Sequence, residues 1–322
     1  MIEIVVVDIG GTHARFAIAR IEGRKVVGLE APTTLHTASH ASLETAWHAY
    51  AARLGQTLPR AAAFAVASPI GGDLIKLTNN PWIIRPSAIA RQLHVDAVTL
   101  INDFAAIGHA VMQLPASDFA HLCGPDVAMP SNGIVGICGP GTGLGVAAVH
   151  QLAGDYHILG SEGGHKDFSP LDAIEDEILR RLRQLHGRVS VERVVSGPGI
   201  VAFYETLAAI EGRAVAARDD REVWDRALSG ADSLASAALD RFCMALGAFA
   251  GDVALVQGAG GMVISGGLGL RLKDRLLESA FGQRFVAKGR FAPLMNRIPV
   301  KLVTHDQPGL FGAAAAFARE HC

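Results

Sequence analysis

The chain has 322 residues, of which 50% are hydrophobic and 19% are charged, and its formal net charge is −2. This length allows two globular domains, and the near-neutral charge predicts no nucleic-acid partner. The four cysteines form no CxxC pair, which argues against a structural zinc site or a disulfide scaffold and favours a cytoplasmic location.

Two segments bear on targeting and membranes. The N-terminus lacks the basic region of a signal peptide, and its apolar run is broken at Asp8. The uncharged segment 253–270 contains six glycines and reads as a buried turn region, so no membrane partner is expected.

The first predicted element is a buried strand over residues 4–7, followed by Asp8-Ile9-Gly10-Gly11-Thr12. Glycines let backbone N–H groups approach an anion closely. Asp8 could hold Mg²⁺ directly or through water, and the Thr12 hydroxyl could reach a phosphate. A hairpin turn with an incidental aspartate is the alternative.

Alternating and helical patterns predict the other elements of a first domain. The early strands are joined by short turns and predict an antiparallel meander that leads a mixed sheet. The turn-rich segment with Asn79 and Trp82 is expected to be a loop. We expect strands at 16–19, 25–29, 61–67 and 98–101, and helices at 43–54 and 104–114.

The second half repeats the opening plan of strand, glycine turn with threonine, and strand, here at 134–138, 139–145 and 146–149. The preceding segment 115–130 is expected to be a loop at a domain boundary. Ser169-Pro170 is expected to cap a helix. Further elements are predicted as helices near 174–185, 200–210 and 239–256, a strand-to-glycine turn at 262–267, a strand at 300–303 and a helix after Pro308.

The glycine turns match neither common nucleotide motif. No Gly-Lys dipeptide occurs, which excludes a P-loop. The glycines at 139–145 have the wrong phase for G-x-G-x-x-G, and the first glycine turn leads into a strand, not a helix, so a Rossmann site is not expected. Two such turns could clamp a polyphosphate while the third underlies an adenosine.

Together, the motifs resemble those of the bacterial ATP-dependent glucokinases, the non-ROK branch within the actin, hexokinase and heat-shock-ATPase superfamily. They appear in the family's order across nearly the whole chain. They are Val7-Asp8-Ile9-Gly10-Gly11-Thr12, Ile101-Asn102-Asp103-Phe104, Gly141-Thr142-Gly143-Leu144-Gly145, Glu162-Gly163-Gly164-His165, Glu192-Arg193-Val194 with Ser196-Gly197-Pro198-Gly199, Ser265-Gly266-Gly267 and His305-Asp306-Gln307-Pro308-Gly309.

The resemblance implies an α/β fold of two actin-like ATPase (ribonuclease-H-like) domains, with mixed sheets flanked by helices and a cleft between the domains. The small domain would comprise residues 1–114 and the C-terminal helix 308–322, and the large domain residues 115–307. The implied reaction transfers the γ-phosphoryl of Mg-ATP to the 6-hydroxyl of glucose, giving glucose 6-phosphate, with domain closure excluding water.

The resemblance also implies that Asp103 is the catalytic base. A carboxylate at a strand end can accept the proton of an alcohol as its oxygen attacks phosphorus. Asn102 would hold a sugar hydroxyl. The alternative for this Asn-Asp pair is helix capping, and both roles can hold together.

The remaining sugar ligands implied by the resemblance are Glu162, His165 and Glu192, with Asn79 and Trp82 lining the same cleft. Ionised carboxylates are strong acceptors for sugar hydroxyls. Metal ligation is another interpretation of Glu162 and His165, and a surface ion pair with Arg193 is the alternative for Glu192.

For the nucleotide, the resemblance places Asp8 near Mg²⁺ through water. Gly266 and Gly267 would pack against the nucleoside. The phosphates would contact Ile9, Gly10, Gly11 and Thr12, with Gly141, Thr142 and Gly143 opposite.

The chain departs from the family pattern at His13, Asn80-Pro81, Ser161 and Lys166, which leaves nucleotide affinity and sugar selectivity open. Glucose and ATP are the expected ligands, Mg²⁺ the expected metal, and a homodimer the implied assembly. A kinase for another hexose or an amino sugar remains an alternative. A sugar-sensing regulator is a further one, although the first strand begins too early for a preceding DNA-binding domain.

Overall fold

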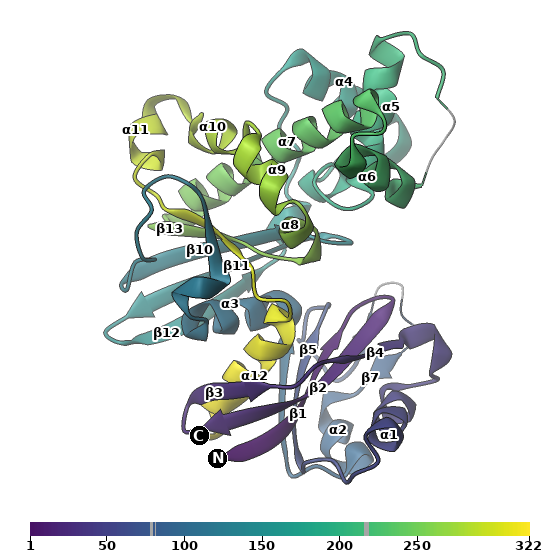
Figure 1. Ribbon diagram of the computed structural model, residues 1–322, viewed down its shortest axis with the longest axis vertical. Coiled ribbons are helices and arrows are strands. Elements are labelled where there is room, and N and C mark those ends of the chain that lie inside the picture. The colour runs from purple at the N-terminus through teal and green to yellow at the C-terminus, as the bar shows by residue number, and fades with distance from the viewer. Residues whose placement is uncertain (78–79, 81, 216–218) are drawn as a thin grey trace. The chain divides into compact units, whose positions relative to one another are not determined.

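A computed structural model describes residues 1–77, 80, 82–215 and 219–322. The chain forms two compact units, Met1–Pro115 with His305–Cys322 and Ala116–Thr304 (Figure 1). Each unit is built on one mixed sheet. No helix in these described ranges is both long and apolar enough to cross a bilayer.

The sheet of the first unit has the strand order β3-β2-β1-β5-β8, with β4 paired to β2. Its first strands pair antiparallel, whereas β5 joins β1 and β8 joins β5 in parallel. The described elements are β1 (Ile2–Ile9), β2 (His13–Glu22), β3 (Lys25–Leu29), β4 (Thr33–His36), η1 (Thr37–Ser39), α1 (Leu43–Leu54), β5 (Ala61–Val66), β6 (Ile75–Lys76), β7 (Ile83–Ile84), α2 (Pro86–Leu93), β8 (Ala97–Asn102), α3 (Asp103–Gln113) and α12 (Pro308–His321).

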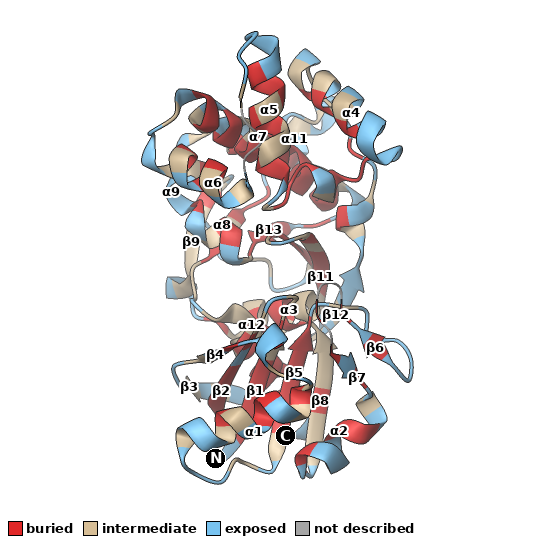
Figure 2. Cartoon of the chain, turned by 90° about the vertical axis from the view of Figure 1, so that its right-hand side faces the viewer, coloured by how far each residue is buried: buried red, intermediate tan, exposed pale blue. Residues whose placement is uncertain are grey.

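Strand β1 is buried on both of its faces, which explains its unbroken apolar sequence. Val5 and Val7 belong to the core cluster that includes α1 and α2. Ile4 and Val6 belong to the cluster on the other face, with α12. Figure 2 shows β1 and β5 as buried strands. Because the strand is fixed from both sides, the residues that follow it leave the sheet in a defined direction.

Helix α12 comes from the end of the chain and packs beside α3 in the first unit. Their closest approach is at Gly312, where an added Cβ would lie 1.8 Å from the Ala106 carbonyl oxygen. Such backbone contact is possible only without a side chain. The C-terminal helix therefore supports α3, the helix that begins at Asp103.

The sheet of the second unit has the order β12-β11-β10-β13-β14-β9 and repeats the plan of the first, an antiparallel meander followed by parallel strands. Its described elements are η2 (Ala116–Asp118), β9 (Phe119–Cys123), β10 (Gly133–Pro140), β11 (Leu144–Leu152), β12 (Asp155–Ser161), η3 (Gly163–His165), α4 (Ala173–His186), η4 (Val191–Arg193), α5 (Gly199–Ile210), α6 (Asp220–Ser229), α7 (Ser233–Gln257), β13 (Gly261–Ile264), α8 (Gly267–Arg271), α9 (Lys273–Glu278), α10 (Phe281–Val286), η5 (Gly289–Phe291), α11 (Ala292–Met295) and β14 (Val300–Val303).

Three sequence-based expectations are wrong in detail. Segment 115–130 is not all loop, because Phe119–Cys123 forms β9 and pairs with β14. Segment 253–270 is not one turn region, since it holds the end of α7, β13 and the start of α8. Helix α4 is capped by Asp172 rather than Ser169, because the Asp172 carboxylate accepts the first free amides of the helix.

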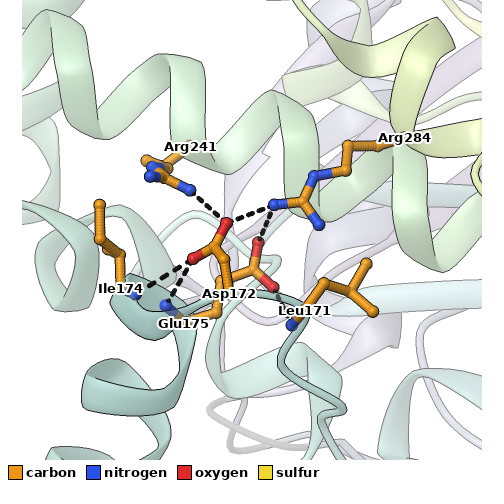
Figure 3. Close-up of polar contacts among 6 residues, drawn as sticks. All are labelled: Leu171, Asp172, Ile174, Glu175, Arg241 and Arg284. Carbon is orange, nitrogen blue, oxygen red and sulfur yellow. Dashed lines mark hydrogen bonds and ion pairs between the residues drawn. The ribbon is translucent and has the colours of Figure 1, made fainter.

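The Asp172 carboxylate also joins α4 to two other helices (Figure 3). One oxygen accepts the amides of Ile174 and Glu175 at 3.1 Å each. The other accepts Arg241 of α7 at 2.6 Å and Arg284 of α10. Although burial opposes ionisation, the Glu175 amide and the two guanidinium groups hold the pKa of Asp172 below its ordinary value.

Glu175 extends the same network into the interior. Its side chain is 2% exposed and contacts Arg284 at 3.2 Å and the Leu171 amide at 2.7 Å. Burial raises the pKa of Glu175, and Arg284 only partly offsets this effect. Arg284 therefore pairs with two carboxylates. The ionised form of Asp172 is stabilised, whereas burial makes Glu175 costly to ionise.

We expect Arg284→Met to lower the free energy of unfolding at neutral pH by about 2–4 kcal/mol, because Glu175 would remain as a buried charge with one partner fewer. The difference in unfolding free energy between Arg284→Met and the wild type should become smaller as the pH falls. A raised native pKa means that the folded Glu175 takes up a proton before the unfolded one, so falling pH relieves this cost. Urea denaturation at several pH values measures both effects.

The matched control is Arg180→Met, which removes an arginine from an exposed pair with Glu177 on α4. Its unfolding free energy should change little at any of these pH values. A deficit in Arg284→Met that grows as pH falls would contradict the assignment of Glu175.

Candidate functional site

The first glycine turn closes the hairpin between β1 and β2. The Gly10 amide donates to the His13 carbonyl at 2.9 Å, and Gly11 and Thr12 form the tip. Ile9 is fully buried, and its carbonyl accepts the Ala67 amide at 3.0 Å. Ile9 thus contributes to the core, while the three residues after it form the turn, with Thr12 exposed at its tip.

The carbonyls of this turn are all held by the protein. Asn80 donates from Nδ2 to the Gly10 carbonyl at 3.0 Å. Thr37 donates from Oγ1 to Gly11 at 3.1 Å and from its amide to Thr12 at 3.0 Å. Among the described residues, the amides of Gly11 and Thr12 donate to no protein acceptor. The turn therefore presents two fixed N–H groups, a suitable arrangement for an anion.

Asp8 lies at the end of β1, just before this turn. Its carboxylate pairs with Arg15 at 3.3 Å and is 22% exposed. Burial raises the pKa of Asp8, and the charge and hydrogen bond of Arg15 oppose that rise. Gly309, at the start of α12, leaves room for the carboxylate, since an added Cβ would lie 3.1 Å from Oδ2.

Asn102 and Asp103 stand where β8 passes into α3. Asn102 caps the helix by accepting the amides of Phe104 at 2.9 Å and Ala105 at 3.2 Å, and its Nδ2 donates to Ser68 at 3.3 Å. The capping role proposed as its alternative is therefore present. Asp103 is the first helical residue, and its Oδ1 accepts the Phe104 amide at 2.9 Å. The positive end of the helix stabilises a carboxylate there.

In the second unit, the turn between β10 and β11 is closed by the Gly141 amide, which donates to Gly143 at 2.8 Å. The Gly141 carbonyl accepts the Gly197 amide at 2.7 Å. Trp224 of α6 in turn donates from Nε1 to the Gly197 carbonyl at 2.8 Å. Thr142 is exposed at the tip. The segment around Gly197 thus supports the backbone of the turn, and Thr142 at the tip is exposed.

Glu192 contacts both this turn and His165, another of the sugar ligands implied by the resemblance. Its Oε2 accepts the amide of Leu144, the residue after Gly143, at 2.9 Å. Its Oε1 lies 3.9 Å from His165 Nε2. Glu192 is therefore fixed by a backbone amide and faces His165.

Glu162 and His165 flank the two glycines of η3, and both are exposed. An added Cβ at Gly164 would lie 2.0 Å from the Leu144 carbonyl oxygen, so the glycine lets η3 lie directly on the start of β11. In the part of the chain that the structure describes, no three His, Cys, Asp or Glu side chains gather as metal ligands.

The third glycine turn follows β13. Gly266 has φ +96°, which only glycine adopts readily, and an added Cβ would lie 2.8 Å from the Pro140 carbonyl oxygen. Gly267 has open space around its Cα. This turn lies against the end of β10, the strand that leads into Gly141. Two of the three predicted turns are thus neighbours within the second unit.

Asn79 lies outside the described residues. Trp82 is 1% exposed in the core of the first unit, and its indole donates to the His40 carbonyl at 2.8 Å. Three contributors were missed by sequence reasoning: Arg15, Thr37 and Trp224. Their contacts depend on strand register and helix packing, and no motif or spacing indicates them.

A family model described as Glucokinase matches residues 5–320. The glucokinase of Zymomonas mobilis subsp. mobilis is 55% identical over 319 residues, covering 99% of this chain and 98% of the relative. The chain belongs to the glucokinase family. The predicted family and kinase class are confirmed.

Solved structures agree with this glucokinase-family assignment. The crystal structure of a glucokinase from an Antarctic psychrotroph has a TM-score of 0.85 and 35% identity, covering 99% of both chains. A glucokinase from Balamuthia mandrillaris, solved in complex with glucose, has a TM-score of 0.76 and 20% identity, covering 99% of this chain and 94% of that one, and supports the fold alone. The predicted two-domain α/β fold class is confirmed.

The contact between Gly143 and Glu192 gives a direct test of the site geometry. An added Cβ at Gly143 would lie 2.5 Å from Glu192 Oε2, whereas one at Gly141 would meet nothing within 4 Å. Gly143→Ala should displace Glu192 and cost about 1–3 kcal/mol of unfolding free energy, since the Leu144 amide loses its charged acceptor. Urea denaturation measures the cost.

Gly141→Ala, in the same turn, is the matched control and should stay within about 0.5 kcal/mol of the wild type. Equal destabilisation of the two variants would show that the turn backbone, rather than the approach of Glu192, is the sensitive feature.

Proposed function

We propose that this chain transfers the γ-phosphoryl group of ATP to the 6-hydroxyl of glucose. The observation that carries the proposal is the placement of the Glu192 carboxylate, which accepts the Leu144 amide beside Gly143 and faces His165 at 3.9 Å. A group of sugar-hydroxyl acceptors next to a glycine turn is what phosphoryl transfer to a sugar requires. The match to the Glucokinase family model and the 55% identity to the Zymomonas glucokinase support the choice of sugar.

Asp103 is the proposed general base. It stands at the carboxyl end of a parallel strand and at the first position of a helix, where its carboxylate accepts the Phe104 amide. Its carboxylate would accept the proton of the 6-hydroxyl as that oxygen attacks the γ-phosphorus and the bond to the β-phosphate oxygen breaks.

The proposed sugar ligands are Glu162, His165 and Glu192, with Asn102 and Asn79. Glu192 is already oriented by the Leu144 amide, so one of its oxygens keeps free lone pairs for a hydroxyl. The Asn102 Oδ1 already accepts two helix amides, whereas Nδ2 donates one hydrogen to Ser68 and keeps the other for a sugar hydroxyl. These ligands would select a hexose by its hydroxyl pattern.

The proposed phosphate contacts are the two glycine turns, Gly10 to Thr12 and Gly141 to Gly143, with Gly266 and Gly267 toward the nucleoside. The carboxylate oxygens of Asp8 fit Mg²⁺, which keeps most of its waters and takes few protein ligands. When bound, Mg²⁺ would neutralise charge on the phosphates. As the family resemblance implies, we propose that Asp8 contacts Mg²⁺ through water.

We further propose a cytoplasmic homodimer. All four cysteines are free thiols in the structure, as suits a reducing compartment that supplies ATP. Sedimentation velocity should give a species of twice the chain mass of 33.8 kDa. A single monomeric species at micromolar concentration would contradict the dimer and leave the proposed reaction in place.

The function is tested by coupled ADP release with glucose, mannose, fructose, galactose and N-acetylglucosamine in turn. Hexose-dependent release that is greatest with glucose is expected. A stronger response to another sugar would replace glucose as the substrate, and no release with any of them would overturn the kinase proposal.

Asp103→Asn should lower kcat by about 10²–10⁴-fold with little change in the KM for glucose, because the amide cannot accept the proton. The same coupled assay measures both constants. Asp96→Asn is the matched control, since Asp96 is an exposed partner of Arg60 on the same unit and should leave kcat unchanged. Full activity in Asp103→Asn would exclude Asp103 as the base.

A further inference from the structure

Lys166 directly follows His165 and connects the two segments that carry the proposed sugar ligands. Its amide donates to the Gly163 carbonyl at 3.2 Å and so closes η3. Its carbonyl accepts the amide of Val191, the residue before Glu192, at 2.9 Å. A movement of Lys166 would therefore be transmitted to both His165 and Glu192.

The side chain of Lys166 reaches a different element, α7. Its Nζ lies 3.2 Å from Asp252 Oδ2 and 5.9 Å from the centroid of the Phe249 ring. The side chain is 38% exposed and that of Asp252 34% exposed. A pair of this exposure contributes little on its own unless its geometry is fixed by further contacts.

Lys288 supplies that fixed geometry. Its Nζ contacts the other oxygen of Asp252 at 2.7 Å and donates to the Ala248 carbonyl at 2.8 Å, and its side chain is only 8% exposed. Gly251 makes room for it, because an added Cβ would lie 2.6 Å from Lys288 Cε. Asp252 is thus held from one side by a buried lysine and presents its second oxygen to Lys166.

We propose that Lys166 is a positioning residue, and that the Lys166–Asp252–Lys288 chain of charges fixes the sugar-binding segments on α7 and sets the affinity for the hexose. This inference rests on the proposed function of Glu162, His165 and Glu192. The nucleotide turn is held separately, since the Gly197 amide donates to the Gly141 carbonyl. Loss of the Lys166–Asp252 ion pair should therefore weaken sugar binding more than nucleotide binding.

The test is Lys166→Met, which keeps the length of the side chain and removes its charge. The KM for glucose should rise by about fivefold or more, the scale of one fixed charged contact. The KM for ATP should stay within about twofold of the wild type. Lys166→Arg, which retains charge and reach, should restore the glucose KM, and Asp252→Asn should reproduce the effect of Lys166→Met.

The matched control is Lys301→Met, which removes a lysine of the same unit from its pair with Asp126 at 3.5 Å and should leave both KM values unchanged. Partial unfolding lowers the apparent kcat and leaves KM intact, so a destabilised variant still gives a decisive answer. An unchanged glucose KM, or an equal rise in both KM values, would overturn the positioning role.

The two hypotheses fail in different ways. A wild-type enzyme without hexose-dependent ADP release contradicts the proposed function and this inference with it. An active wild type, combined with an unchanged glucose KM in Lys166→Met and Asp252→Asn, contradicts this inference alone.

Discussion

The site in the second unit depends on how closely two turns approach the first residue of β11. The Glu192 carboxylate accepts the Leu144 amide beside Gly143, and Gly164 lies against the Leu144 carbonyl. Both contacts need a position without a Cβ, so glycine is required at 143 and 164 for a packing reason as well as for flexibility. Because Leu144 serves both contacts, the Glu192 carboxylate and η3 meet at the first residue of β11.

In the first unit, the glycine turn is held through its carbonyl groups. Buried Thr37 and Asn80 satisfy the turn carbonyls, and the amides of Gly11 and Thr12 have no protein acceptor among the described residues. Asp8 lies at the same edge, held by Arg15 and given room by Gly309 of the C-terminal helix. An unsatisfied amide is costly when buried and useful when it meets an anion. The turn carbonyls therefore have partners within the protein, while the Gly11 and Thr12 amides are available to an anion.

Much of the fold could be predicted because its central elements carry strong local patterns. Strand β1 is apolar on both faces, and α1 and α3 show clear periodicity with Ser42 and Asn102 as caps. Weakly patterned elements were missed. Half of the ten residues of helix α6 are charged, and β9 becomes a strand only because β14 offers an edge with which it pairs. The cap of α4 was misplaced at Ser169, although Asp172 caps the helix through the amides two and three residues later.

The sequence by itself determined the family, the order of the glycine turns and the types of side chain available for acid-base and sugar chemistry, because these depend on local motifs and on their spacing. The tertiary structure alone decided which of these residues meet. It joined Glu192 to Leu144 and His165, placed Ile9 in the core, and tied Lys166 to Asp252 on α7. Those contacts join segments up to 86 residues apart, as in Lys166 and Asp252. No local pattern can specify them, because they arise from strand register and helix packing.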